Sequence, residues 1–505
     1  MREIYFMLLG LIFLSACQEQ NVTNVQQDVI QGPTGNLLDS LLTPYVEILR
    51  ARTNNEGGLA IGVVKGDDIV YAKTFGYADM DRGSKVDLNT KFHIASLSKP
   101  FVAAAVLKLR EMGKVDLDDP IGKHLPELEE TNSPFAPVTI KQILTHTSGI
   151  PRHISVDDWR NPVIGDDALE KNLMELADFE LDFEPGAKYS YSNAAFDVLG
   201  LVVSRISGQS YFDFVEQALF LPAGMNGTTF RKPGSELPKD WANSHSFGLQ
   251  DQVLTPYPYN LKIAPSSGVK SSILDMCQWA RMHLGKGKVD GQEVLSEESF
   301  SSLVSPQAKT PWGDDIGLSW YLQQYLDRPI IMHTGESHGF ESMFYIYPEE
   351  EISIIILANR SFSRAGRIVN AVSEVLFDSP LKAYQVSGVY KYADLYKAQG
   401  LEKANQAWEE MRTDTTDIYF IDDYDLLTSA DILDNGQQGQ ASKDLLELFM
   451  EHNANSTYAW RLYGNAHLNL GDTTNAIIAC EKTLEINPNY EKGRNALEQL
   501  VGQRN

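Results

Sequence analysis

Cysteine is scarce in this sequence, with only three in 505 residues. Cys277 and Cys480 lie far apart, each in a stretch with helical patterning, so we expect no disulfide framework. Neither has a neighbouring histidine of the kind that activates a thiol nucleophile. The third, Cys17, follows the apolar start of the chain and is interpreted together with it. We therefore expect neither a disulfide-stapled fold nor cysteine catalysis.

Basic charge is also in short supply, since 43 Lys and Arg stand against 68 Asp and Glu, for a net charge of −25. This balance argues against nucleic-acid binding, which needs a basic surface. Metal-ligand spacings such as His-Glu-x-x-His are missing, so we predict neither a metal nor another cofactor. His146 and His153 are interpreted as packing or surface histidines. Trp312 and Trp320 could line a pocket, although most large aromatic residues belong to a core.

Long apolar runs are missing as well, because the apolar stretch over residues 4–14 is too short to span a membrane. With Arg2 in front of it, this stretch predicts a targeting segment. Leu14-Ser15-Ala16-Cys17 resembles the bacterial lipobox. The resemblance implies a signal peptide over residues 1–17, a lipid on Cys17, and anchorage in the bacterial cell envelope on its periplasmic or extracellular face. The alternative is an ordinary secretory signal with a chance cysteine.

The length of the chain suggests two or three domains. Polar residues over 18–36 predict a flexible tether. Residues 37–380 mix helical and strand patterns, whereas strand signals stop in residues 381–505. We therefore expect a mixed domain followed by a helical one.

Strand patterns lie at both ends of the mixed domain. Residues 58–64 and 68–75 flank the turn Lys65-Gly66-Asp67 and predict a β-hairpin. Four further strand-like runs follow much later, at residues 318–323, 330–333, 340–347 and 352–358. Helical patterns fill the space between, so we expect the two ends to share one antiparallel sheet. The predicted fold class is α+β: a sheet flanked by helices, a helical subdomain, and then an α-helical repeat domain.

The strongest chemical signal is a serine followed three residues later by a lysine, Ser96 and Lys99. After Pro100 the apolar residues recur at helical spacing, which places Ser96 at a helix start and Lys99 one turn further on the same face. A hydroxyl needs a base to become a nucleophile, and a desolvated amine can act as one. The unpaired N–H groups of a helix start can stabilise an oxyanion. This pattern favours Ser96 as a nucleophile.

Three other serines carry similar spacing or motifs. Ser267 precedes Lys270 in a turn-like stretch, and Ser379 precedes Lys382 but is followed by Pro380, which disfavours a helix. Ser337 lies in Gly-Glu-Ser-His-Gly, which matches the nucleophile elbow G-x-S-x-G. That elbow requires a strand, a sharp turn and a helix, whereas both flanks of Ser337 are strand-like. Context therefore favours Ser96 over all three.

Three short elements in order resemble the serine β-lactamase and DD-peptidase superfamily, most closely its class C β-lactamase-related branch. They are Ser96-x-x-Lys99, Tyr191-Ser192-Asn193 and His333-Thr334-Gly335. The resemblance runs over about residues 37–377 and includes the stretches at 113–120, 144–151 and 222–225. It implies a penicillin-binding protein-like serine hydrolase that works through an acyl-enzyme on a small-molecule or peptide substrate.

The resemblance also implies a role for each matching residue. Ser96 is the acylated nucleophile, and Lys99 and Tyr191 share its proton, with the identity of the base left open. Asn193 orients Lys99 and the substrate amide. The backbone N–H groups of Ser96 and Glu336 form the oxyanion hole.

The third element departs from the Lys-Thr-Gly of many β-lactamases, because His333 stands in the place of the lysine. A lysine would be a fixed cation for a β-lactam carboxylate, whereas an ordinary imidazole is half charged only near pH 6.5. Thr334, Gly335 and the backbone beyond them are expected to hold the acyl group. We therefore expect ester, D-amino-acid peptide or weak β-lactam hydrolysis rather than efficient β-lactamase activity.

The last part of the chain has the spacing of a tetratricopeptide repeat, carried by Trp460, Gly464, Ala476 and Pro488. Residues 426–453 resemble a degenerate preceding copy, and residues 397–411 predict a further helix. These helices either dock a protein or peptide partner or serve as a structural cap, and both possibilities remain open. Because no site motif lies beyond residue 377, we expect the chemistry to be separable from the repeats. A second hypothesis is a catalytically retired sensor or docking protein, against which the complete Ser96, Lys99 and Tyr191 set argues.

Overall fold

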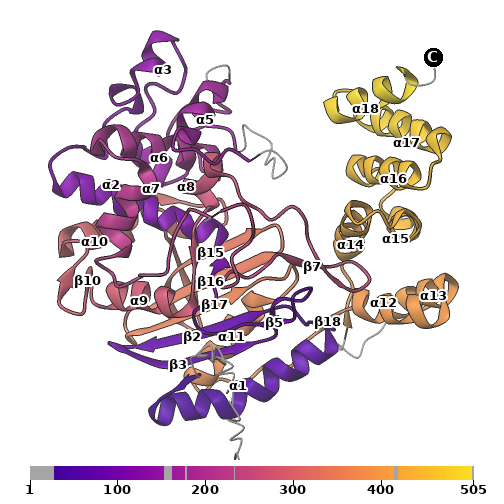
Figure 1. Ribbon diagram of the computed structural model, residues 1–505, viewed down its shortest axis with the longest axis horizontal. Coiled ribbons are helices and arrows are strands. Elements are labelled where there is room, and N and C mark those ends of the chain that lie inside the picture. The colour runs from indigo at the N-terminus through magenta and orange to yellow at the C-terminus, as the bar shows by residue number, and fades with distance from the viewer. Residues whose placement is uncertain (1–27, 153–161, 177–178, 233, 414–418, 503–505) are drawn as a thin grey trace, which may run out of the picture.

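The computed structural model describes residues 28–152, 162–176, 179–232, 234–413 and 419–502 (Figure 1). The predicted signal peptide, the lipid on Cys17 and the interpretation of His153 lie outside these residues and stay predictions. Within the described ranges, no helix combines the length and the apolar character that crossing a membrane requires.

A nine-stranded antiparallel sheet forms the centre of the mixed domain (Figure 1). Its order is β1-β3-β2-β17-β16-β15-β14-β13-β12, so the N-terminal hairpin pairs with the last strand through β2 and β17. The prediction that the two ends share one sheet is confirmed. The strands are β1 Val29–Ile30, β2 Leu59–Lys65, β3 Asp68–Phe75, β12 Ala308–Lys309, β13 Asp315–Ile316, β14 Tyr321–Tyr325, β15 Arg328–Ser337, β16 Phe340–Tyr347 and β17 Ile352–Ala358.

Helices cover both faces of this sheet. On one face α1 (Gly32–Arg52) and α11 (Ala365–Leu376) pack on the strands, with Leu38, Leu42 and Val369 in their shared core. On the other face lie α9 (Ile273–Leu284) and the helical subdomain. The sequence of β17 is apolar at nearly every position because both of its faces are covered.

The predicted tether is wrong over its last residues. Val29 and Ile30 form β1 and pair with β3, and α1 begins at Gly32 rather than at residue 37. Pro33 lies in the first turn of α1, where its missing N–H costs no hydrogen bond. The polar composition of this segment concealed a helix start.

The helical subdomain is built around α2 (Lys99–Glu111) and α6 (Asn193–Ser207), which pack against each other. Ten residues of α2 are buried, consistent with its alanine-rich sequence, which lets neighbouring helices approach closely. The remaining helices of the mixed domain are α3 Pro126–Glu130, α4 Ile140–Leu144, α5 Ala168–Leu176, α7 Tyr211–Val215, α8 Ala264–Ser267 and α10 Glu297–Val304. Short strand pairs join β4 Tyr77–Asp79 to β5 Ser84–Lys85, β6 Phe92–His93 to β9 Lys270–Ser271, β7 His245–Phe247 to β8 Asp251–Val253, and β10 Lys288–Val289 to β11 Gln292–Glu293.

The C-terminal helices form what we call the helical arm, residues 388–502, which stands beside the mixed domain in Figure 1. Its helices are α12 Gly388–Gln399, α13 Leu401–Arg412, α14 Asp423–Asn435, α15 Gly439–His452, α16 Thr457–Asn469, α17 Thr473–Ile486 and α18 Glu491–Gly502. The expected copy over residues 426–453 falls on α14 and α15, but the helix expected over 397–411 is divided at Gly400. Two short strands, β18 Val386–Ser387 and β19 Tyr419–Phe420, interrupt the region expected to lack strands.

The helical arm shares a core with the mixed domain. Phe247, from β7, packs in the same apolar cluster as Tyr390 and Trp408 of the arm. Arg360 is fully buried at this junction, with an ion pair of 2.7 Å to Asp251 and a hydrogen bond of 3.2 Å to the Tyr390 hydroxyl. The two parts of the sequence are therefore joined by a desolvated charge network as well as by apolar packing.

Candidate active site

Ser96 lies in a short 3-10 turn, Ala95–Ser98, that runs directly into α2. Lys99, the first residue of α2, has no exposed surface, and its Nζ lies 3.1 Å from Ser96 Oγ. The same Nζ donates to the Ser266 carbonyl at 2.8 Å, which fixes the amine beside the hydroxyl. The structure thus brings the predicted nucleophile and its lysine together at a helix start.

The turn before Ser96 has an unusual backbone. Ala95 has a φ of 49°, a left-handed conformation that non-glycine residues rarely adopt. Its N–H donates to Nδ1 of the buried His93 at 3.2 Å, and burial holds the pKa of that imidazole well below its usual value. A neutral His93 is therefore available as the acceptor that holds this turn in place.

Tyr191 and Asn193 lie at the N-terminus of α6. Ser192 caps the helix by accepting from the Ala195 N–H at 3.0 Å, and Asn193 is the first helical residue. The Tyr191 hydroxyl interacts with Ser96, an interaction that favours the phenolate, and the Tyr191 ring lies 4.7 Å from Lys99 Nζ. Burial raises the pKa of Tyr191 well above that of a free phenol, so this side chain is neutral at physiological pH.

The strand β15 brings His333, Thr334, Gly335 and Glu336 alongside the serine turn. A Cβ atom at Gly335 would lie 2.3 Å from the Ile94 carbonyl oxygen and 3.1 Å from the Ser96 nitrogen. Only glycine allows this approach, which sets the backbone of β15 next to the Ser96 N–H. The predicted oxyanion hole, made by the N–H groups of Ser96 and Glu336, depends on this close approach and stays a prediction.

His333 is buried and uncharged. Its Nδ1 lies 2.7 Å from the Thr334 carbonyl, and burial together with the neighbouring Lys99 lowers the pKa of the imidazole to about 3. Desolvation disfavours the imidazolium, so His333 does not follow the ordinary imidazole, which is half charged near pH 6.5. His333 is therefore neutral where many β-lactamases are expected to carry a lysine.

Sequence reasoning did not assign three neighbours of the site. His146 stacks on Tyr191 with ring centroids 4.2 Å apart, and its Nδ1 accepts from the Ser192 N–H at 3.2 Å. Asp197 is nearly buried in α6 and accepts from the Ser266 N–H at 2.9 Å, while Ser266 in turn binds Lys99. Asp197 is the one carboxylate in the apolar sequence of α6 and lies one turn after Asn193. This isolated charge could have been used to infer a buried hydrogen-bond partner.

The competing serines have unsuitable surroundings. Ser337 ends β15 and pairs with Phe340 across the turn into β16, so a strand rather than a helix follows it. Ser267 ends α8 while Lys270 lies in β9, which separates the pair by a change of secondary structure. Ser379 lies in an irregular segment after α11. The described structure places none of these residues in a helix-start arrangement like that of Ser96.

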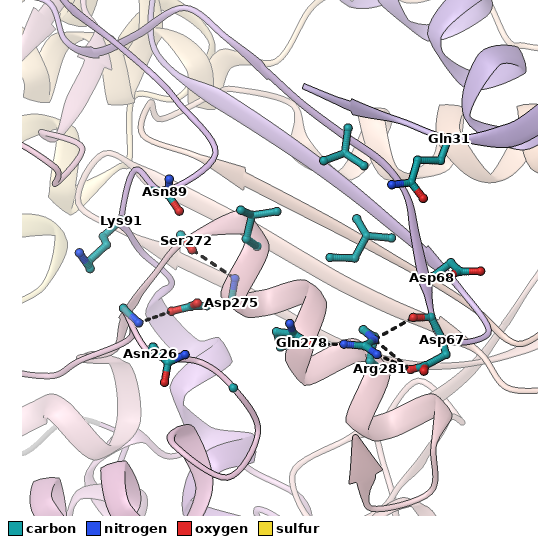
Figure 2. Close-up of a pocket in the computed structure, with 15 residues that line it drawn as sticks. Gln31, Asp67, Asp68, Asn89, Lys91, Asn226, Ser272, Asp275, Gln278 and Arg281 are labelled. Carbon is teal, nitrogen blue, oxygen red and sulfur yellow. Dashed lines mark hydrogen bonds and ion pairs between the residues drawn. The ribbon is translucent and has the colours of Figure 1, made fainter. Parts of the chain in front are cut away.

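A cleft of about 660 Å³ lies elsewhere on the mixed domain, between the β2–β3 turn and α9 (Figure 2). In this cleft Arg281 pairs with Asp67 and Asp290, and Asp275 accepts from the Gly227 N–H. None of the predicted site residues lines it. The cleft is therefore not the candidate active site.

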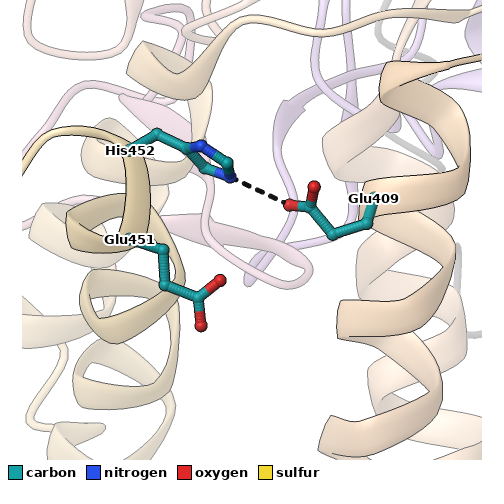
Figure 3. Close-up of side chains that lie close together, drawn as sticks. All are labelled: Glu409, Glu451 and His452. Atoms are coloured by element: carbon teal, nitrogen blue, oxygen red, sulfur yellow. Dashed lines mark hydrogen bonds and ion pairs between the residues drawn. The ribbon is translucent and has the colours of Figure 1, made fainter.

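Among the described residues, one group has the ligand types of a metal site: Glu409, Glu451 and His452 on the helical arm (Figure 3). All three side chains are exposed. Glu409 already accepts from His452 at 3.1 Å and pairs with Arg412 at 3.3 Å. These contacts account for the cluster as surface ion pairing, and the prediction that the protein needs no metal is unaffected by it.

The antiparallel sheet flanked by helices, with a serine and a lysine at the start of α2, defines the class as the β-lactamase and DD-peptidase fold. The chain belongs to the beta-lactamase family, whose model matches residues 38–376. Members of this family are generally serine hydrolases. The helical arm lies outside the match.

Relatives and solved structures agree with this assignment. The protein flp of Staphylococcus aureus (strain MRSA252) is 27% identical over 340 residues, which span 67% of this chain and 66% of that protein. Penicillin-binding protein 4* of Bacillus subtilis (strain 168) is 29% identical over 339 residues, spanning 63% of this chain and 71% of the relative. The octameric penicillin-binding protein homologue from Pyrococcus abyssi has a TM-score of 0.59 at 26% identity, covering 68% of this chain and 78% of the other. A class C beta-lactamase mutant shares the fold, with a TM-score of 0.57 at 21% identity, covering 68% of this chain and 97% of the other.

Proposed function

We propose that this protein is a serine hydrolase that forms an acyl-enzyme at Ser96 with an ester or amide substrate. The observation that carries the proposal is that the partly exposed Ser96 hydroxyl lies beside the buried Lys99 amine and interacts with the Tyr191 phenol. Gly335, which has no side chain, brings the backbone of β15 next to the Ser96 N–H. A nucleophile, two groups that can handle its proton and an oxyanion site thus meet at one point.

In the proposed reaction Ser96 Oγ attacks the substrate carbonyl carbon and loses its proton to the Lys99–Tyr191 pair. Tyr191 is a neutral phenol and does not take up the proton, so the first acceptor is Lys99 in its unprotonated amine form. The carbonyl oxygen becomes an oxyanion that the N–H groups of Ser96 and Glu336 stabilise. The leaving alcohol or amine takes the proton as the carbonyl re-forms. Water then repeats the sequence on the acyl-enzyme and releases the acid.

The neutral His333 points to the substrate class. An anionic β-lactam would lose a charge-assisted contact typically worth about 1.5–3 kcal/mol, whereas a neutral ester loses nothing of that kind. We therefore propose esters, or peptides that carry a D-residue, ahead of penicillins. The names of the penicillin-binding relatives support an acyl-transfer reaction of this type without fixing the substrate.

Labelling with a fluorescent fluorophosphonate tests the assignment of the nucleophile. Ser96→Ala should abolish both labelling and esterase turnover, whereas Ser337→Ala, the matched control in the nearby hairpin, should keep both. Labelling that persists in Ser96→Ala and maps to Ser337 by mass spectrometry would reverse the assignment.

The second candidate is a docking protein that acts through the helical arm. Tyr424 on α14 and Tyr458 on α16 are 64% and 40% exposed, which offers aromatic contact area to a protein or peptide. Under this hypothesis a fluorophosphonate would leave every serine unlabelled in a folded protein. Combined with the proposed lipid on Cys17, either function would operate at the cell envelope.

A further inference from the structure

Trp312 and Trp320 both lie near the candidate active site, but only Trp320 is part of the hydrophobic core. Trp320 is 1% exposed, whereas Trp312 is 58% exposed. Trp312 sits at the tip of a tight turn between β12 and β13, where the Gly313 N–H donates to the Thr310 carbonyl at 3.1 Å. Pro311 precedes it at the position where its fixed φ suits such a turn. The indole is thus presented to solvent by a short, constrained segment.

The indole also stands at the outer end of a series of ring contacts that leads to the reacting groups. Its ring meets the edge of Tyr189 at 5.5 Å between centroids and lies 6.3 Å from Tyr321. The two tyrosine hydroxyls share a hydrogen bond of 2.7 Å, which fixes both rings. Tyr321 in turn lies 5.5 Å from His333.

A second branch of ring contacts reaches the proton-handling pair. The Tyr189 and His146 ring centroids lie 5.7 Å apart, and His146 stacks on Tyr191, which interacts with Ser96. The rings contacting Trp312 are therefore themselves in contact with the two sides of the candidate active site. A single exposed tryptophan on a surface needs no explanation, but one held against the walls of a reactive site calls for one.

We propose that Trp312, with Tyr189 and Tyr321 behind it, forms a substrate subsite for a flat apolar group, such as the aryl ring of an arylacyl ester or amide. This inference rests on the proposed function and names the substrate class. Aromatic rings pair favourably through offset or edge contacts, and here the subsite already has its supporting rings in place. Trp312, Tyr189 and Tyr321 are themselves uncharged, and the two cations that contact this series of rings, Lys99 and Arg152, lie over Tyr191, on the side of the reacting groups. The outer end of the series therefore suits an apolar group.

Boronic acids test the subsite without requiring turnover. Ser96 Oγ adds to the boron atom, its proton passes to the Lys99–Tyr191 pair, and no group leaves. The wild-type protein should bind phenylboronic acid more tightly than methylboronic acid. In Trp312→Ala the ratio of the dissociation constants, methylboronic acid over phenylboronic acid, should fall by about three- to tenfold, the range expected for a lost aromatic pair. Trp312→Phe should retain most of the preference, because it keeps a ring on the turn.

Leu221→Ala is the matched control, since Leu221 is 57% exposed and belongs to none of these contacts. It should leave the ratio as in the wild type. A folded Trp312→Ala protein that keeps the full phenyl preference would overturn the subsite while leaving the proposed function intact. Failure of both boronic acids to bind at Ser96, with no fluorophosphonate labelling, would instead overturn the proposed function.

Discussion

Replacing Gly335 by alanine is the sharpest perturbation of the candidate active site. The new methyl group would lie 2.3 Å from the Ile94 carbonyl oxygen and 2.4 Å from Ser342 Oγ. An ordinary carbon–oxygen contact is about 3.3 Å, so β15 and the serine turn must separate by roughly 1 Å. The Ile94 contact is with backbone and cannot be relieved by a change of rotamer.

A displacement of this size should affect activity more than folding. A misplacement of about 1 Å can cost on the order of 100-fold in rate, and the loss of an oxyanion donor about 100- to 1,000-fold. The steric strain itself should cost about 1–3 kcal/mol of stability, which a protein of this size can sustain. We therefore expect Gly335→Ala to remain folded and to react with a fluorophosphonate at least about 100-fold more slowly than the wild type.

The assay is the rate of fluorophosphonate labelling, followed beside thermal unfolding by circular dichroism. Gly366→Ala is the control, because a Cβ atom there meets only Met343 Cε at 3.6 Å and alanine favours the helix α11. It should label at the wild-type rate. If Gly335→Ala also labels at that rate while folded, the oxyanion arrangement inferred from β15 is refuted.

Four further predictions concern other parts of the chain. His333→Lys should raise the rate of penicillin acylation while keeping ester turnover, measured as kcat/KM for nitrocefin and an acetate ester; an unchanged nitrocefin value would contradict the role given to its neutral charge. A chain ending at residue 380 should lose stability, because Phe247 and Arg360 lose their partners in the arm, but its folded fraction should still label; a folded but inert chain would place the arm in the site. Cys17→Ser should release the protein from membranes or leave it unprocessed, and intact mass of a mature wild-type form without acyl chains would refute the anchor. Acid should destabilise the fold: burial lowers the pKa of His283 to about 4, so the stability that it contributes is present above about pH 6.5 and is lost as the pH falls toward 4, by about 1.4 kcal/mol per pH unit. Other buried histidines add to the slope, so the check is the difference in slope between the wild type and His283→Phe, measured by urea unfolding at two pH values.

Local patterns in the sequence predict six of the nine strands of the sheet and the candidate nucleophile. The hairpin β2–β3 and the apolar run of β17 follow from local patterning, since a strand covered on both faces must be apolar throughout. Ser96 and Lys99 are three residues apart at a helix start, so their proximity is a local property of the chain. Local patterning failed at two positions. The polar composition around Pro33 concealed the start of α1, and the polar composition around Gly400 concealed the break between α12 and α13.

The electrostatic state of the candidate site depends on contacts that form only in the folded chain. The neutral charge of His333 comes from burial among residues distant in sequence, which no local pattern encodes. The support of Lys99 by Ser266 likewise joins residues far apart along the chain, and Asp197 enters the site only through Ser266. The two tryptophans near the site were equivalent in sequence, yet packing buries Trp320 and leaves Trp312 exposed. Local spacing fixes which groups lie on one helix turn, whereas desolvation and long-range contacts, which set their chemistry, exist only once the chain has folded.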